Sequence, residues 1–194
     1  MTETPAISDI PPVTIGPGRL ILVVGPSGAG KDTLIGLAQA ACAADGNVVF
    51  PRRVVTREAT AYEDNVHVSF EAFRQASGKG EFAVHWEAHG HCYALPRAID
   101  DDIRDRRTVV ANVSRTVIDA MRRAYADVVV VSITAPAEIL AERLAARARS
   151  SDGQIADRLG RTVDSVATAP DVTISNVGCA EHHALELLRI IRGD

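Results

Sequence analysis

The chain has no apolar run near the ~18 residues that a membrane span needs, and its pure apolar runs are short, such as the four valines 128–131. The first basic residue is Arg19, so no cationic segment precedes an apolar one and no signal peptide is expected. Basic residues are not in surplus, since 21 Lys and Arg face 25 Asp and Glu. A chain without excess positive charge is a poor general binder of nucleic acid. These absences indicate a cytoplasmic protein with neither membrane nor nucleic-acid partners.

Cysteine is also scarce: Cys42, Cys92 and Cys179 lie far apart and are odd in number. Their spacing supports neither a disulfide framework nor a zinc site, and it agrees with reduced thiols in the cytoplasm. The 194 residues, 46% of them hydrophobic, suffice for one globular core. The oligomeric state stays open between a monomer and a homodimer.

Short β-branched apolar runs divide the chain. Residues 1–18 hold four prolines and little periodicity, which predicts a flexible N-terminal tail. From residue 19 we expect a single domain with an α/β fold, in which helices flank a parallel five-stranded sheet. The expected strands are 20–24, 48–55, 108–111, 128–133 and 172–174.

The stretch 56–96 interrupts the alternation of strands and helices. It contains three of the four Phe, the only Trp and four of the six His. An insertion rich in aromatic and polar side chains predicts a substrate-binding lobe. The core of the domain is then expected over 19–55 and 97–194.

A glycine-rich segment fits the phosphate-binding pattern G-x-x-x-x-G-K between a predicted strand and a predicted helix. Glycines let successive backbone N–H groups point at one phosphate, and the helix N-terminus adds partial positive charge. Lys31 would supply a full charge to the β- and γ-phosphates. The predicted ATP-binding residues are Gly25, Pro26, Ser27, Gly28, Ala29, Gly30, Lys31, Asp32 and Thr33.

The residue after the lysine departs from the usual pattern. A Ser or Thr hydroxyl normally ligates Mg²⁺ at this place, whereas this chain carries Asp32. A carboxylate is a hard oxygen ligand and would hold Mg²⁺ directly or through water. The alternative is that Asp32 only favours the helix N-terminus as an anion.

Several segments between about Arg19 and Arg192 resemble guanylate kinases. They include the phosphate-binding loop, Thr56-Arg57, residues 82–96, residues 143–147, Arg158-Leu159 and residues 174–176. The resemblance implies a P-loop kinase with a substrate-binding lobe and an arginine-bearing lid at about 147–158. In that lid Arg147 and Arg158 would close over the transferred group.

Two of the departures from guanylate kinases fall on residues that read the base. The Glu that reads guanine falls on Val84, a base-contacting hydroxyl falls on Leu95, and a core Asp falls near Asn112. An apolar site cannot select guanine by pairing its polar edge. The phosphate-gripping residues Arg57 and Tyr93 are retained, so the site is expected to bind a phosphate without a guanine.

A closer resemblance is to the ribose 1,5-bisphosphate phosphokinases of phosphonate catabolism. It lies in the loop with Asp after Lys, in Glu63, Asn65 and His67, and in residues 85–90. It implies ATP- and Mg²⁺-dependent phosphorylation of the anomeric phosphate, which yields 5-phosphoribosyl 1-diphosphate (PRPP). The residues implied are Lys31, Arg147 and Arg158 for catalysis, Asp32 for Mg²⁺, and Arg57, Glu63, His67, His89 and Tyr93 for the substrate.

Three other interpretations remain: a guanylate or other nucleoside-monophosphate kinase, a sugar kinase of the gluconate type, and a non-catalytic guanylate-kinase-like interaction module. Such modules typically lose the phosphate cradle, which is intact here. His85, His89 and His91 would share one face of a single strand. Hydrogen bonding to a sugar or its phosphates explains them better than zinc, because the usual partner ligands are missing.

Overall fold

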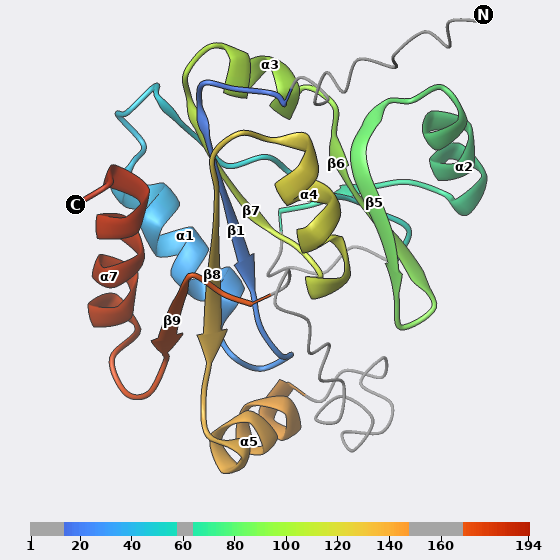
Figure 1. Cartoon of the computed structure of the whole chain (residues 1–194). Helices are drawn as coiled ribbons and strands as arrows, with labels where there is room; N and C mark the ends of the chain where they lie inside the picture. The colour runs from blue at the N-terminus through green and yellow to red at the C-terminus, as the bar shows by residue number, and fades with distance from the viewer. Residues whose placement is uncertain (1–13, 58–63, 148–168) are drawn as a thin grey trace, which may run out of the picture.

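The computed structural model describes residues 14–57, 64–147 and 169–194 (Figure 1). Five strands form a wholly parallel sheet, which confirms the predicted α/β core. Its order is β2 (Val48–Val49), β7 (Thr108–Asn112), β1 (Arg19–Val24), β8 (Val128–Thr134) and β9 (Val172–Ser175). No described helix is long and apolar enough to cross a membrane.

Strand β1 runs through the middle of the sheet and is buried on both faces. Leu20, Leu22 and Val24 pack into one hydrophobic cluster, whereas Ile21 and Val23 pack into another. Successive side chains of a strand point to opposite faces, so a strand covered on both sides has no polar alternation. The unbroken apolar run in the sequence follows from this position.

Helices cover the two faces. On the Ile21 face lie α1 (Lys31–Ala41) and α7 (Ala180–Arg192), while α3 (Ile99–Arg104) and α4 (Ile118–Ala124) contribute to the opposite cluster. Helix α5 (Ala137–Arg147) follows β8. Helix α7 buries apolar residues at i, i+3, i+4 and i+7 from Ala184, which is the pattern of an amphipathic helix.

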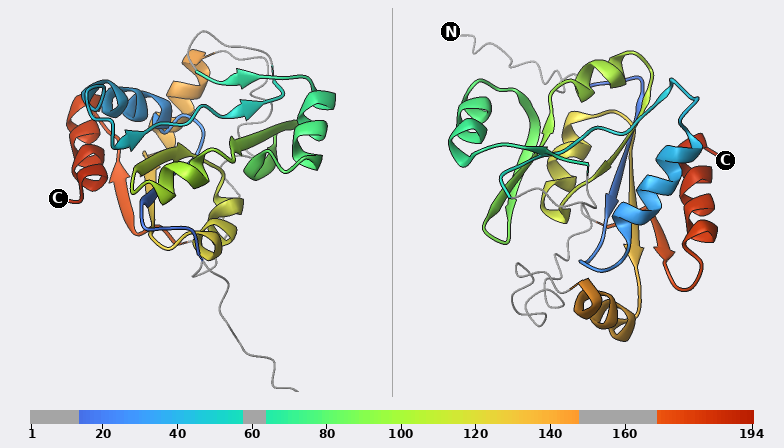
Figure 2. Two further views of the ribbon diagram at one scale, coloured as in Figure 1. Left: turned by 90° about the horizontal axis from the view of Figure 1, so that it is seen from above. Right: turned by 180° about the vertical axis from the view of Figure 1, so that it is seen from behind.

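The segment between the core strands forms a second sheet of four strands. Its order is β4 (Val66–His67), β3 (Val54–Val55), β6 (His91–Pro96) and β5 (Phe82–Ala88), with α2 (Phe70–Gly78) packed against it. Figures 1 and 2 show α2 on the side of the molecule opposite α7. We call this unit the lobe.

The strand predicted over 48–55 is wrong, because the structure has two short strands in different sheets. Strand β2 pairs with β7 in the core, and β3 pairs with β4 and β6 in the lobe. Pro51 lies between them and has no N–H to donate to a ladder. The chain therefore leaves the core sheet before residue 56.

The expected tail ends earlier than residue 18. Ile15 forms an isolated parallel bridge with Tyr125, and the Gly18 N–H donates to the Ile103 carbonyl at 2.8 Å. A Cβ at Gly18 would lie 2.4 Å from the Arg107 carbonyl oxygen, so this segment fits closely against the core. Residues 1–13 lie outside the described part of the chain.

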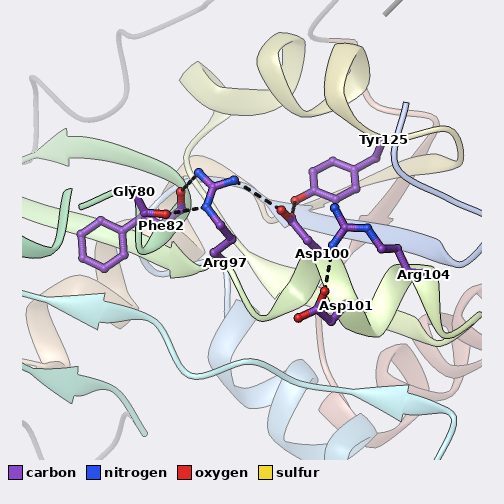
Figure 3. Close-up of polar contacts among 7 residues, drawn as sticks. All are labelled: Gly80, Phe82, Arg97, Asp100, Asp101, Arg104 and Tyr125. Carbon is purple, nitrogen blue, oxygen red and sulfur yellow. Dashed lines mark hydrogen bonds and ion pairs between the residues drawn. The ribbon is translucent and has the colours of Figure 1, made fainter. Parts of the chain in front are cut away.

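Arg97 connects the lobe to the core directly after β6 (Figure 3). Its guanidinium donates to the carbonyls of Gly80 and Phe82, at 2.5 and 2.7 Å, and lies 3.4 Å from the carboxylate of Asp100. Asp100 is buried and accepts a 2.5 Å hydrogen bond from the Tyr125 hydroxyl. One arginine thus ties two lobe carbonyls to a buried carboxylate of α3.

Replacing Tyr125 by Phe is expected to lower the free energy of unfolding by about 1–2 kcal/mol at about pH 8, because a buried hydrogen bond to a charged group is lost. Burial, and next the bond to Asp100, raise the pKa of Tyr125 above its ordinary 10. Its stabilising contribution is therefore complete below pH 10 and declines as the pH rises above that value. Urea unfolding across this range should show a weaker alkaline decline in the Phe variant. Equal declines in both proteins would contradict this.

Candidate active site

The phosphate-binding loop joins the carboxyl end of β1 to the N-terminus of α1. Gly25, Gly28 and Gly30 have φ angles of 146°, 84° and 87°, a region that favours glycine. A Cβ on Gly25 would lie 2.0 Å from the backbone oxygen of Ile133 in the adjacent strand. The loop therefore needs glycine both for its conformation and for its close approach to β8.

Lys31 lies against this loop. Its Nζ donates to the carbonyl oxygens of Gly25 and Pro26, each at 2.9 Å. The ammonium group is thus held by backbone oxygens of the segment that is predicted to cradle the phosphates. A nucleotide arriving there would offer phosphate oxygens in place of these carbonyls.

Asn176 and Arg143 donate hydrogen bonds to backbone carbonyls of the loop. Asn176 is 3% exposed, and its Nδ2 donates to the Ala29 carbonyl at 2.7 Å. Arg143 donates to the carbonyls of Asn176 and Gly28, at 3.1 and 3.4 Å. Both residues mark the resemblance in the sequence, but their contact with the loop was not predicted, since only the fold brings β9 and α5 to it.

Asp32 contacts two residues of other elements. Its Oδ1 accepts a 2.7 Å hydrogen bond from Nδ2 of Asn112 and lies 3.6 Å from a guanidinium nitrogen of Arg53. Asp32 stands where a hydroxyl residue usually follows the loop lysine, and Asn112 stands near the place of a core Asp in guanylate kinases. A second carboxylate at Asn112 would face Asp32 at this distance and repel it. The two departures therefore compensate each other.

The structure brings Arg57 and His67 together. A carbonyl oxygen only accepts, so His67 donates its Nδ1 proton to the Arg57 carbonyl at 2.9 Å. Thr56 pairs with Cys92 through its N–H and its hydroxyl. These contacts hold the segment that carries Arg57 against β4 and β6.

Other predicted site residues cannot be placed. Glu63 and Arg158 lie outside the described residues, as does most of the predicted lid. Arg147 ends helix α5, and its side chain is outside the described part. Their roles remain predictions.

Tyr93 lies on the inner face of the lobe hairpin. Its ring stacks on Trp86 with centroids 5.7 Å apart and planes inclined by 11°. Both side chains are 8% exposed and belong to the main hydrophobic cluster. Tyr93 therefore has a packing role, and its predicted contact with a substrate phosphate remains a prediction.

The expectation that three histidines share one face is wrong. His89 and Gly90 form a two-residue turn with positive φ angles of 54° and 74° between β5 and β6. His91 pairs with Ala88 and His85 pairs with Ala94, which places these two histidines on opposite faces of the hairpin. The chain reverses at this turn, so residues 85–91 do not form one continuous strand. His89 itself lies at the turn.

The two positions aligned with base-reading residues are apolar and packed. Val84 pairs with Leu95 across the hairpin, and Leu95 is fully buried. Both belong to or pack against the main hydrophobic cluster. These side chains offer no hydrogen bond to a base.

Cys92 is not a candidate nucleophile. Burial, and next the neighbouring Glu87, raise the pKa of its thiol above the ordinary value. A reactive cysteine requires the thiolate, which this environment disfavours.

A cavity of about 220 Å³ opens beside the N-terminal half of α1. Polar groups converge on it from α1, from β7 and from the segments before β3 and β4. The sequence did not reveal it as a site, because Arg52 and Arg53 belong to no recognised motif. Its lining includes Asp32, Gly36, Arg52, Arg53, Asn65 and Asn112.

A scan against models of protein families finds no match. The chain is 64% identical over 180 residues to "Ribose 1,5-bisphosphate phosphokinase PhnN" of Bradyrhizobium diazoefficiens, covering 93% of this chain and 91% of that protein. It is 67% identical over 178 residues to the protein of the same name from Rhodopseudomonas palustris, covering 92% and 90%. Among solved structures, guanylate kinase from Anaplasma phagocytophilum matches with a TM-score of 0.65 at 24% identity, covering 93% of this chain and 86% of that one. The fold is thus that of a P-loop kinase, and the chain belongs to the ribose 1,5-bisphosphate phosphokinase family.

Proposed function

We propose that this protein transfers the γ-phosphoryl group of ATP to the anomeric phosphate of ribose 1,5-bisphosphate. An oxygen of the 1-phosphate forms a bond to the γ-phosphorus, the bond to the ADP oxygen breaks, and PRPP and ADP result. The observation that carries the proposal is the intact loop with Lys31 held against it, in a chain 64% identical to a relative that bears this activity in its name.

The chemistry asks the protein mainly for positioning and charge neutralisation. The acceptor oxygen is already ionised, so no strong general base is needed. Lys31 would exchange its carbonyl partners for oxygens of the β- and γ-phosphates. Arg57 would bind the acceptor phosphate through two N–H groups, with His67 holding its backbone. Arg147 and Arg158 would add positive charge from the lid.

The residues present fit a bound Mg²⁺. Such sites commonly use one or two carboxylates together with phosphate oxygens and water. Asp32 supplies one carboxylate beside the loop, and Asn112 orients it. No cluster of three or more His, Cys, Asp or Glu side chains suited to a metal occurs among residues 14–57, 64–147 and 169–194. The ion would neutralise charge on the phosphates.

Replacing Asp32 by Asn is expected to raise the Mg²⁺ concentration needed for half-maximal activity about tenfold, because a neutral amide binds a hard cation more weakly. The rate at varied Mg²⁺ and saturating ATP measures this. Asp45→Asn is the matched control, since it makes the same change of charge at an exposed position beyond the end of α1. An unchanged Mg²⁺ requirement in Asp32→Asn would leave that carboxylate with only its structural role.

A direct assay separates this function from the alternatives. The purified protein is incubated with ATP, Mg²⁺ and either ribose 1,5-bisphosphate or GMP, and ADP and the phosphorylated product are measured. PRPP without GDP supports the proposal. GDP would favour a guanylate kinase despite the apolar Val84 and Leu95. Turnover of neither, with no ATP binding, would favour a non-catalytic module.

We also propose a cellular location, partners and an assembly for the enzyme. We expect it in the cytoplasm, where ATP and sugar phosphates occur, with small molecules as its partners. A homodimer is the assembly we would test first, by light scattering on the eluting protein.

A further inference from the structure

The cavity beside α1 lies where the carboxyl ends of parallel strands meet. Phe50 to Arg53 follow β2, and Asn112 ends β7. Open α/β sheets bind ligands outside these strand ends. The cavity thus lies between α1 and the start of the lobe, with Asp32 on its wall.

Arg53 is the cavity's inner cation. Its side chain is only 15% exposed. Its Nε donates to Oδ1 of the buried Asn65 at 3.3 Å, and its terminal nitrogen lies 3.6 Å from Oδ1 of Asp32. The guanidinium therefore spans from the lobe to the helix that carries Lys31.

Arg52 differs from its neighbour. Its side chain is 55% exposed, forms a 2.7 Å ion pair with Asp64, and donates to the Asn65 carbonyl at 3.1 Å. Arg52 thus contacts two other residues that line the cavity, Asp64 and Asn65. The two arginines carry the same charge at adjacent positions but face different surroundings.

We propose that the cavity is a second phosphate subsite and that Arg53 binds the phosphate that does not react, the 5-phosphate of the acceptor. This inference rests on the proposed function, in which the acceptor carries two phosphates. Arg57 serves the reacting one, so the other needs its own cation. A shielded guanidinium binds phosphate through paired N–H groups and more strongly than an exposed one.

The size of the cavity also favours a sugar phosphate. Its volume of about 220 Å³ is below the ~300–1,000 Å³ typical of pockets for drug-sized ligands. A pentose phosphate is a small ligand of matching polarity. Asn65 and Asn112 line the same space and offer amide groups to sugar hydroxyls.

Asp32 also lines this cavity, and its carboxylate disfavours a bound anion there. The negative charge of its carboxylate repels a phosphate in the cavity unless a bound cation balances that charge. Replacing Asp32 by Asn should therefore tighten the binding of a sugar phosphate in the absence of metal and nucleotide. A cavity that served only packing would show no such gain.

The test is calorimetric titration with ribose 5-phosphate, with neutral ribose as the reference ligand, in the absence of ATP and Mg²⁺. Arg53→Gln is expected to weaken ribose 5-phosphate binding about tenfold, the loss of one charge-assisted contact. Arg52→Gln is the matched control and should change it less than about threefold. Asp32→Asn should tighten it about threefold or more.

A variant that leaves every charge in place checks the same cavity by volume. Gly36 lies on α1 at the cavity wall, and a Cβ there would meet nothing within 4 Å. Gly36→Met should fold at least as well as the wild type, since Met is a better helix former than Gly by roughly 0.7 kcal/mol or more. It should nevertheless weaken ribose 5-phosphate binding about tenfold, which tests the inference even if Arg53→Gln fails to fold.

Equal losses in Arg52→Gln and Arg53→Gln would overturn the assignment, because general charge would then explain the binding. So would a wild type that does not bind ribose 5-phosphate. A wild type that produces PRPP while Arg53→Gln keeps its KM for ribose 1,5-bisphosphate defeats this inference alone. A wild type without turnover defeats the proposed function, and the titration still decides the subsite.

Discussion

Lys31→Met is expected to lower kcat about 10³-fold, because the variant loses the one full positive charge that the loop brings to the transferred phosphoryl group. The two hydrogen bonds from Nζ to Gly25 and Pro26 would also be lost. Each such bond contributes roughly 1 kcal/mol or less at a partly exposed site. The variant should therefore fold and still lose its activity, as steady-state kinetics with saturating ATP would show.

The chain offers a closely matched control for this substitution. Lys79 is the only other lysine, and it caps helix α2 in the lobe. Lys79→Met makes the same change of charge and volume and should keep kcat within about twofold. If Lys31→Met retained more than a tenth of the wild-type rate, the loop would not be the phosphoryl-transfer site.

Gly25→Ala is expected to destabilise the protein by about 3 kcal/mol or more and to abolish ATP binding. The added Cβ would lie 2.0 Å from the backbone oxygen of Ile133, and the φ of 146° suits only glycine. Backbone of a central strand cannot move aside as a flexible side chain can. Either β1 and β8 separate at this point or the loop changes course. Urea unfolding and a nucleotide titration measure the two effects.

Gly78→Ala separates this effect from a general cost of removing glycine. Gly78 ends helix α2, and a Cβ there would meet nothing within 4 Å. Its substitution should leave stability unchanged or raise it by up to about 1 kcal/mol. Similar losses in both variants would mean that the close approach of Gly25 to Ile133 is not what demands glycine.

The sequence predicts best what depends on neighbouring residues. The loop at 25–31, the buried strand before it and the helix after it are all present, because turn chemistry and apolar runs are local properties. The five parallel strands follow from the same kind of pattern. Among the predicted core strands, the prediction fails only around Pro51, since two dipeptide strands carry too few residues to display a period.

What the sequence could not predict depends on contacts between distant segments. Asp32 and Asn112 are 80 positions apart, and only the fold shows that these two departures from the usual P-loop and guanylate-kinase patterns share a hydrogen bond. Arg53 belongs to no motif, and its burial next to Asp32 arises from the path of the chain out of the core sheet. The faces on which His85 and His91 lie depend on the turn at 89–90, where the chain reverses.

The pairing of β1 has a consequence for the order in which a ribosome can build this protein. Leu20 pairs with Val109 on one side and with Val128 on the other. Strand β1 can therefore form both of its ladders only after residue 128 has been synthesised. The carbonyl of Ala29 accepts its hydrogen bond from Asn176, which is synthesised 147 positions later. The loop is synthesised long before the contact from β9 that completes it. A nucleotide that binds only the completed loop therefore stabilises the chain only after β9 has been made.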